Sequence, residues 1–125
     1  MIRLYALVAL GGAIGSVGRY WLGGAVARVA GTSFPWGTVL INVLGSFAIG
    51  WLAALTITGR GQSAPSVQAF AMVGLCGGFT TFSAFSLQTV ELLRAGAIWA
   101  AAANIGGSVA LCIAATGAGL AWGRQ

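Results

Sequence analysis

Hydrophobic residues dominate this chain in four long segments, which short polar turns separate. Arg19 is the one charged residue inside these apolar runs. A helix needs about 20 mostly apolar residues to cross a bilayer. The pattern therefore predicts an all-α membrane protein with a single domain, residues 1–125. Its four transmembrane helices are expected over about residues 4–27, 35–57, 67–93 and 97–122.

The third predicted helix contains Gly74, Gly77 and Gly78, and hydroxyl and phenyl side chains follow directly. Glycine weakens a helix by about 1 kcal/mol relative to alanine, so these residues predict a break near residues 75–81. In lipid, a broken helix is tolerated only where protein or a wet cavity surrounds it. We therefore expect the break at mid-membrane, with its freed carbonyls and amides available as ligands.

Charged residues make up 6% of the 125 residues and hydrophobic residues 58%, whereas soluble domains carry about a quarter charged residues. The charges are six arginines and one acid, Glu91, and the chain has no histidine. These residues cannot form an acid–base pair, a catalytic triad or a protein metal cage, which argues against an enzyme. The scattered arginines are atypical of nucleic-acid binding and typical of anchoring at lipid headgroups. Cys76 and Cys112 lie in apolar runs, which favours buried thiols over a disulfide.

The arginines at the helix ends are almost evenly divided between the two sides of the membrane. Four helices place both termini on one side, with Arg3, Arg60 and Arg124, while Arg28 and Arg94 fall on the other. The positive-inside rule needs a clear excess of Lys and Arg to set one orientation. The division therefore predicts that the chain inserts both ways round and pairs as an antiparallel homodimer of dual topology.

Polar side chains occur inside the predicted helices in several groups. The second helix carries Asn42, with Thr38 one turn before it and Ser46 one turn after it. The third helix interleaves two serines with two phenylalanines, and the fourth carries a stripe of residues four apart, which share one helix face. These residues are Ser83, Ser86, Phe82 and Phe85 in the third helix, and Asn104, Ser108, Cys112 and Thr116 in the fourth.

Most of these groups are hydrogen-bond donors, and phenyl edges carry the positive end of the ring quadrupole. The start of a helix after the break adds oriented amides and a positive dipole end. Such a lining favours the passage of a small anion. A packing explanation competes with it: single hydroxyls, such as those of Thr56 and Thr89, bond their own helix, phenyl rings fill the core, and Arg19 snorkels to the headgroups.

Three segments resemble the small bacterial fluoride channels of the Fluc (CrcB) family. Residues 77–86, GGFTTFSAFS, are similar to the GGxTTFSTF motif of its third helix. Residues 11–15 with Arg19 and Tyr20, and residues 36–45, are similar to its first- and second-helix motifs. The resemblance implies a multi-pass protein of the bacterial inner membrane. Its antiparallel homodimer would export fluoride passively from the cytoplasm through two pores and so lower fluoride toxicity.

The resemblance also implies roles for single residues. Phe82 and Phe85 would meet fluoride with their ring edges, and Asn42 would be the pore asparagine. Gly77 and Thr80 would give backbone carbonyls to a structural sodium ion at the dimer centre, and Arg19 would raise the anion concentration in a vestibule. The other pore donors would be Ser83, Ser86, Thr116, Ser108 and Asn104. Asn104 stands where some members carry tyrosine, and Cys112 is a poorer donor than serine.

Two other functions compete with the channel. A small dual-topology exporter of the multidrug type, coupled to protons, needs an acid deep in a helix. Glu91, the single acid, lies near the end of the third helix instead. A helper subunit without transport activity would leave the donor groups and the break without a purpose. We therefore favour the fluoride channel, with fluoride, lipid and a second copy of the chain as its partners.

Overall fold

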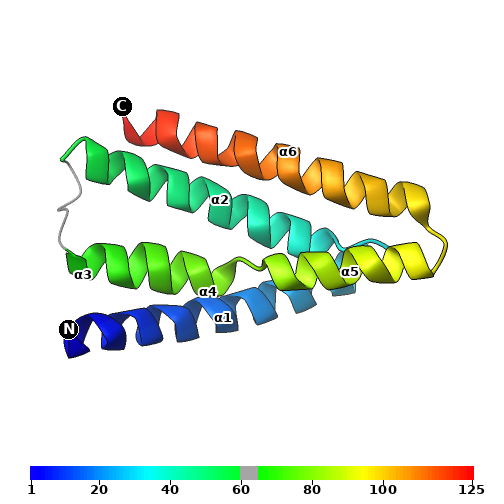
Figure 1. The fold of residues 1–125 in the computed structure, drawn as a ribbon, viewed down its shortest axis with the longest axis horizontal. Helices are drawn as coiled ribbons and strands as arrows, with labels where there is room; N and C mark the ends of the chain where they lie inside the picture. The colour runs from blue at the N-terminus through cyan, green and yellow to red at the C-terminus, as the bar shows by residue number, and fades with distance from the viewer. Residues whose placement is uncertain (60–64) are drawn as a thin grey trace.

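The computed structural model describes residues 1–59 and 65–125, which form four helical rods in antiparallel succession (Figure 1). Three rods are single helices: α1 (Ile2–Ala30), α2 (Trp36–Ile57) and α6 (Ile98–Gly123). The third rod is composite, and consists of α3 (Pro65–Val67), the π-helix η1 (Gln68–Cys76), α4 (Gly77–Phe79) and α5 (Phe82–Arg94). The described residues contain no strand, so the all-α prediction is confirmed.

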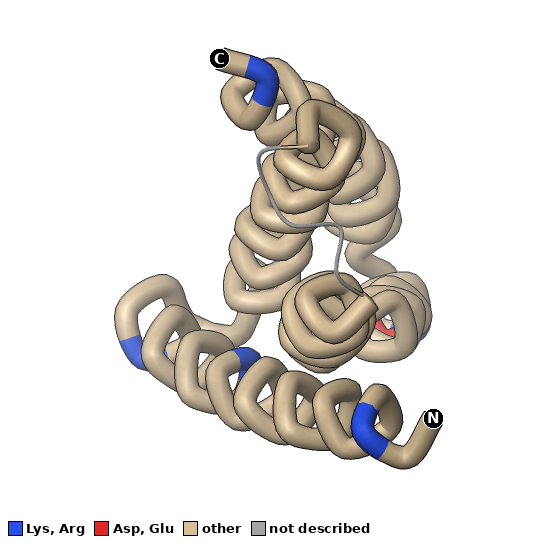
Figure 2. Tube along the Cα trace, turned by 90° about the vertical axis from the view of Figure 1, so that its left-hand side faces the viewer, with Lys and Arg blue, Asp and Glu red and all other residues tan. Residues whose placement is uncertain are grey.

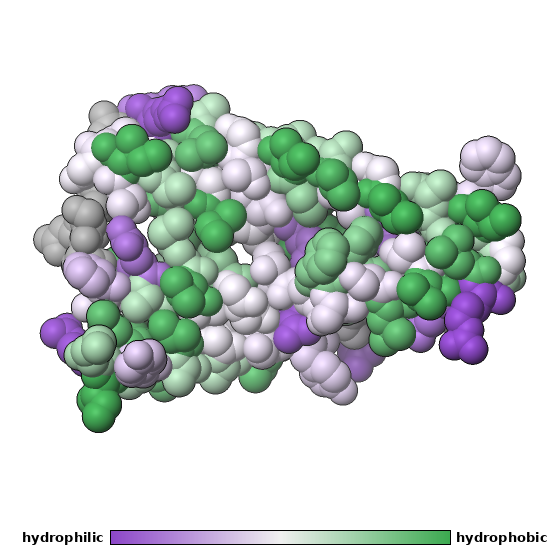
Figure 3. Space-filling model, in the orientation of Figure 1, coloured by the Kyte–Doolittle hydropathy of each residue, from purple (hydrophilic) through white to green (hydrophobic). Residues whose placement is uncertain are grey.

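Three stretches are long and apolar enough to cross a membrane: Trp36–Ile57, Pro65–Arg94 and Ile98–Gly123. Helix α1 has 29 residues and is long enough, but it is not among the three, because Arg19 and its glycines make it less apolar. Figure 3 shows hydrophobic side chains across the visible face, with hydrophilic residues at the two ends and a few near the middle. Large hydrophobic residues are exposed on every rod, as expected of a surface that lipid surrounds.

The third rod is interrupted at Thr80 and Thr81, within the range predicted for the break. Thr80 has φ −80° and ψ 158°, and Thr81 has φ −152° and ψ 115°, so both backbones are extended. Gly74, Gly77 and Gly78 are helical, so the prediction that glycine causes the break is wrong. Tertiary packing overrides the low helix propensity of glycine here.

The glycines instead let α1 pack directly against η1 and α4. A Cβ atom at Gly78 would lie 2.9 Å from the Cα of Gly12, and one at Gly74 would lie 3.0 Å from the Cα of Gly11. Helices α2 and α6 form the other extensive contact. Such close backbone approach stabilises helix association in lipid, where hydrophobicity alone does not.

Charged residues lie mainly at the helix ends (Figure 2). Arg28 lies in the last turn of α1 and Arg94 in the last turn of α5, at the end of the bundle opposite the termini. Arg3 and Arg124 lie near the two termini, which share one end (Figure 1). Arg60, predicted on the same side as the termini, lies outside the described residues.

Candidate functional site

Asn42 on α2 holds the interrupted backbone of the third rod. Its Nδ2 donates to the Thr81 carbonyl at 3.0 Å, and its Oδ1 accepts from the Thr81 N–H at 2.8 Å. In a continuous helix, the N–H of residue 81 would donate to the carbonyl of Gly77. A side-chain amide therefore replaces the backbone partner that Thr81 has lost, and the carbonyl of Gly77 is released from the helical pattern.

Arg19 on α1 contacts the same region from the other side. Its Nε donates to the Gly78 carbonyl at 3.1 Å, and Ser16 Oγ donates to that oxygen at 3.4 Å. Gly78 lies in the last turn before the break, where carbonyls lack helical donors. The positive guanidinium also suits the negative end of a helix. Snorkelling to the headgroups, the packing explanation for Arg19, does not describe a side chain that bonds the backbone of another rod.

Helix α5 begins directly after the break, with Thr81 as its N-cap. Thr81 Oγ1 accepts from the Ala84 N–H at 3.1 Å and lies 3.3 Å from Ser83 Oγ. A threonine in this position satisfies one of the free amides at the start of a helix. The positive end of the α5 dipole therefore points toward the break, as the sequence predicted.

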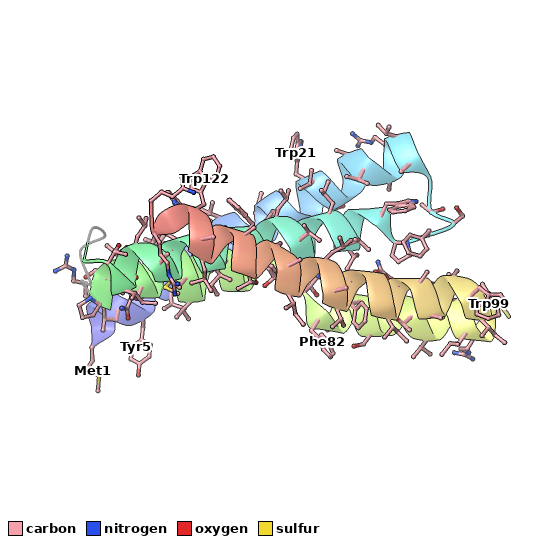
Figure 4. All side chains as sticks on the ribbon, turned by 90° about the horizontal axis from the view of Figure 1, so that it is seen from above. Met1, Tyr5, Trp21, Phe82, Trp99 and Trp122 are labelled. Atoms are coloured by element: carbon pink, nitrogen blue, oxygen red, sulfur yellow. The ribbon has the colours of Figure 1, made fainter. Side chains whose placement is uncertain are left out.

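The rings of Phe82 and Phe85 lie in the first turn of α5, with centroids 5.3 Å apart and planes tilted by 39°. Phe82 is 77% exposed, and Figure 4 shows its side chain projecting away from the bundle. Phe85 is half-buried. Exposure of an apolar ring is ordinary on a surface that lipid surrounds, so the position of the two rings directly after the break, and not their exposure, makes them candidates for the site.

A groove of about 600 Å³ connects these features. It brings together six of the residues that the sequence analysis assigned to ion binding, from α2, the third rod and α6: Asn42, Gly77, Thr80, Phe82, Phe85 and Ser108. Three sulfur-containing residues, Met72, Cys76 and Cys112, also line it, and both cysteines are free. The groove therefore combines apolar walls with a few polar groups, as ligand sites commonly do.

Five predicted site residues do not line this groove: Ser83, Ser86, Asn104, Thr116 and Arg19. Ser86 Oγ donates to the Phe82 carbonyl at 2.9 Å, and Thr116 Oγ1 donates to the Cys112 carbonyl at 3.0 Å. These two hydroxyls bond their own helices. The packing explanation is also confirmed for Thr56, whose hydroxyl donates to the Leu52 carbonyl at 2.9 Å.

Asn104 is a residue of α6, is 1% exposed, and its side chain faces α5. Its Nδ2 donates to Thr89 Oγ1 at 2.9 Å, and its Oδ1 accepts from Ser108 Oγ at 3.3 Å. Thr89 Oγ1 bonds its own helix, as expected, by donating to the Phe85 carbonyl at 2.7 Å. The stripe on α6 therefore faces two directions: Asn104 turns inward, while Ser108 and Cys112 reach the groove.

The two carbonyls predicted to bind a cation, those of Gly77 and Thr80, belong to residues that line the groove. The Gly77 carbonyl has lost its helical donor to Asn42, and Thr80 precedes the cap of α5. No group of three or more His, Cys, Asp or Glu side chains gathers in the described part of the chain. Any hard cation here would therefore depend on neutral oxygens, such as these backbone carbonyls, which suit such ions.

A second cavity of about 560 Å³ lies between the α1–α2 connection and the end of α5. Thr38, Gln88 and Glu91 are among its lining residues. The single acid of the chain is thus exposed in the last turns of α5 and does not lie deep within a rod. A proton-coupled exporter needs an acid buried deep in a helix, and the exposed Glu91 does not meet this need.

Sequence reasoning missed two residues of the site, Thr81 and Ser16. The known preference of threonine for the N-cap could have identified Thr81, since a helical pattern resumes directly after it. No sequence signal distinguishes Ser16, because its partner is a carbonyl 62 residues away.

The chain is similar to proteins of known family. The family model described as CrcB-like protein, Camphor Resistance (CrcB), matches residues 6–120. A protein of Opitutus terrae is 52% identical over 115 residues, which cover 91% of this chain and 87% of that protein. Relatives from Paramagnetospirillum magneticum (54% over 112 residues; 89% and 88% covered) and Agrobacterium fabrum (50% over 120 residues; 96% and 95% covered) match equally broadly. All three relatives are named fluoride-specific ion channel FluC.

Proposed function

This chain belongs to the CrcB family, and from that premise we propose that it is a fluoride-selective channel of the bacterial inner membrane. Fluoride would leave the cytoplasm passively, down its gradient, which lowers its toxicity. The observation that carries the proposal is the identity of about half over nearly the whole chain to relatives named fluoride-specific ion channels. The donor groups along the groove support it, because a strongly hydrated anion needs donors to replace its water.

Asn42, Phe82 and Phe85 form the centre of the proposed path. They line one groove, and the ring edges present partial positive charge to an anion. The N-terminal end of α5 adds the positive end of a helix dipole at the same place. Ser83, Ser86, Thr116 and Ser108 would offer further hydroxyls. To bind the ion, Ser86 and Thr116 must exchange their bonds to backbone carbonyls, and Ser108 its bond to Asn104.

A second copy of the chain, in the opposite orientation, would close the groove and create two pores. The open groove of one copy supports this arrangement, because its polar lining residues, such as Asn42, Thr80 and Ser108, are better covered by protein than by lipid. The near-even distribution of arginines supports insertion in both orientations.

We further propose a structural sodium ion where the two broken rods would meet. The carbonyls of Gly77 and Thr80 from each copy would hold it, since oxygen ligands suit a hard cation. Sodium would supply a fixed positive charge that holds the two breaks together. Arg19, which bonds the Gly78 carbonyl beside the break, would raise the local concentration of anions.

The decisive experiment measures fluoride release from liposomes that contain the purified protein. We expect rapid release of fluoride and no measurable release of chloride under the same gradient. Equal chloride release would contradict a selective channel, and no fluoride release would contradict the channel itself.

Replacing one ring tests the role of the phenyl pair. We expect Phe82→Ile and Phe85→Ile each to lower fluoride release by about tenfold or more, because the ring edge that meets the anion is lost. Phe47→Ile is the matched control, since Phe47 lines a separate cavity with Trp51 and Trp122. Unchanged release in both pore variants would show that the rings only pack.

A further inference from the structure

A chain of hydrogen bonds connects the middle of α6 to the backbone of Phe85. Ser108 Oγ donates to Asn104 Oδ1, Asn104 Nδ2 donates to Thr89 Oγ1, and Thr89 Oγ1 donates to the Phe85 carbonyl. Asn104 is 1% exposed and Thr89 is 7% exposed. In the part of the chain that the structure describes, the Asn104–Thr89 bond is the one side-chain hydrogen bond between α5 and α6.

This geometry does not suit Asn104 for direct contact with an ion. A donor must reach the ion, whereas Asn104 is buried within one copy of the chain and does not line the groove. The single proton of the Ser108 hydroxyl is directed to Asn104 as well. Both residues therefore bond protein groups in this arrangement, although the resemblance to fluoride channels implied that they donate to the ion in the pore.

Helix α5 needs support from its neighbours because the break separates it from the rest of its rod. Asn42 holds its beginning, through both backbone groups of Thr81. Helix α6 packs extensively on α2 and much less on α5. The bond from Asn104 meets α5 at Thr89, about two turns beyond Thr81. Two asparagines, from α2 and α6, thus hold α5 at two separate points.

Two points of attachment fix the rotation of a helix about its own axis as well as its position. If α5 rotated, the buried amide of Asn104 would lose its partner on Thr89. An unpaired buried polar group is costly, and more so where no water can replace the partner. The rings of Phe82 and Phe85, in the first turn of α5, would turn with the helix and lose their positions beside the groove.

We propose that Asn104 is a positioning residue, which fixes the rotation of α5 through Thr89 and so holds the rings of Phe82 and Phe85 in place beside the groove. The inference rests on the proposed channel function, and it gives Asn104 a structural purpose in place of direct fluoride contact. Thr89 acts with Asn104 in this role as its hydrogen-bond partner, although no sequence pattern placed Thr89 in the site.

Substitutions at Thr89 test the proposal in the liposome assay. Thr89→Val keeps the shape of the side chain but removes the hydroxyl that Asn104 bonds. Because α5 then loses one of its two attachments, we expect fluoride release to fall about tenfold. Thr89→Ser keeps the hydroxyl and should release fluoride within about twofold of the unmodified protein. Thr56→Val is the matched control, because its hydroxyl bonds only the Leu52 carbonyl of its own helix. Release at the unmodified rate from Thr89→Val would overturn the proposal.

A double substitution tests whether Thr89 and Asn104 act through the hydrogen bond between them or have independent effects. Asn104→Leu removes the other partner of the bond and should lower release by a factor similar to that of Thr89→Val. If the bond carries the effect, the double variant should be no slower than either single variant. Losses that multiply in the double variant would contradict a shared role.

Hydrogen exchange of the backbone tests the support of α5 without any transport measurement. We expect Thr89→Val and Asn104→Leu to speed amide exchange in residues 82–94 by about tenfold while leaving α2 unchanged. If the unmodified protein releases no fluoride, the channel proposal fails, and exchange rates still decide whether Asn104 holds α5. Unchanged exchange in both variants would overturn the positioning role.

Discussion

The side chain of Asn42 ends in an amide, which offers a C=O acceptor and an N–H donor as a peptide group does. It can therefore take the place of a backbone partner at the break. The N–H of Thr81 loses its helical acceptor at the break, and the amide of Asn42 supplies an acceptor for it and also donates to the Thr81 carbonyl. In lipid, each unsatisfied backbone group would cost several kcal/mol, because no water can replace the lost partner. Asn42 therefore makes the break possible and at the same time places a polar group in the groove.

Asn42→Asp tests this double role at the scale of one residue. The carboxylate keeps an acceptor for the Thr81 N–H but cannot donate to the Thr81 carbonyl, so two oxygens face each other. A negative charge also repels an anion at the centre of the proposed path. We expect fluoride release from liposomes to fall at least about tenfold. Release at the unmodified rate from a variant that elutes as the unmodified protein would show that Asn42 lies off the path.

The third rod shows, at the scale of one element, how a helix can be interrupted without losing its place. Thr80 and Thr81 leave the helical conformation, while α1 holds the segment before them and Asn42 holds the segment after them. The π-helical turns of η1 precede the break, and such turns occur often at functional sites. The glycines on both rods let α1 approach closely enough for Arg19 and Ser16 to reach the Gly78 carbonyl.

Gly15→Ala tests this packing. An added Cβ would meet the Leu75 carbonyl and would lie 2.8 Å from the Phe79 nitrogen, so α1 must move away from the third rod. We expect a loss of about 1–3 kcal/mol of stability, visible as a lower unfolding temperature in detergent.

Gly24→Ala on the same helix is the control for Gly15→Ala. A Cβ there meets no atom within 4 Å, and alanine favours a helix more than glycine does, so the unfolding temperature should stay the same or rise slightly. Equal unfolding temperatures for both variants would show that the close approach of α1 does not stabilise the bundle.

At the scale of the whole molecule, charge at the two ends of the bundle decides orientation. Arg28 and Arg94 occupy one end, and Arg3 and Arg124 lie near the termini at the other. The proposed antiparallel pair needs copies of both orientations in one membrane. A reporter fused after Gln125 should therefore be found on both sides of the inner membrane.

Changing the charge balance should remove one of the two orientations. In Arg28→Gln combined with Arg94→Gln, the positive charge remains near the termini, so these should lie in the cytoplasm in nearly every molecule. Fluoride release should then be lost, because no partner of opposite orientation is present. A reporter on one side only in the unmodified protein, together with full fluoride release, would contradict the antiparallel arrangement.

Much of this protein was predictable from its sequence. The long apolar segments and the scarcity of charge predicted an all-helical membrane protein, because the bilayer accepts few other structures. The alternation of phenylalanines and serines after residue 80 located the candidate site. The resemblance to fluoride channels agrees with the family that the comparisons show.

Tertiary structure alone decided why the break occurs and what each polar residue does there. The glycines, which favour a break locally, are helical because α1 packs on them, and the threonines after them are extended because Asn42, 39 residues away, bonds Thr81. Asn104 was expected to face a pore, but its partner lies on α5. The physical reason is that helix propensity and hydropathy depend on residues close in the sequence. A polar group in lipid must instead find a hydrogen-bond partner, and here the neighbouring helix determines which partner is within reach.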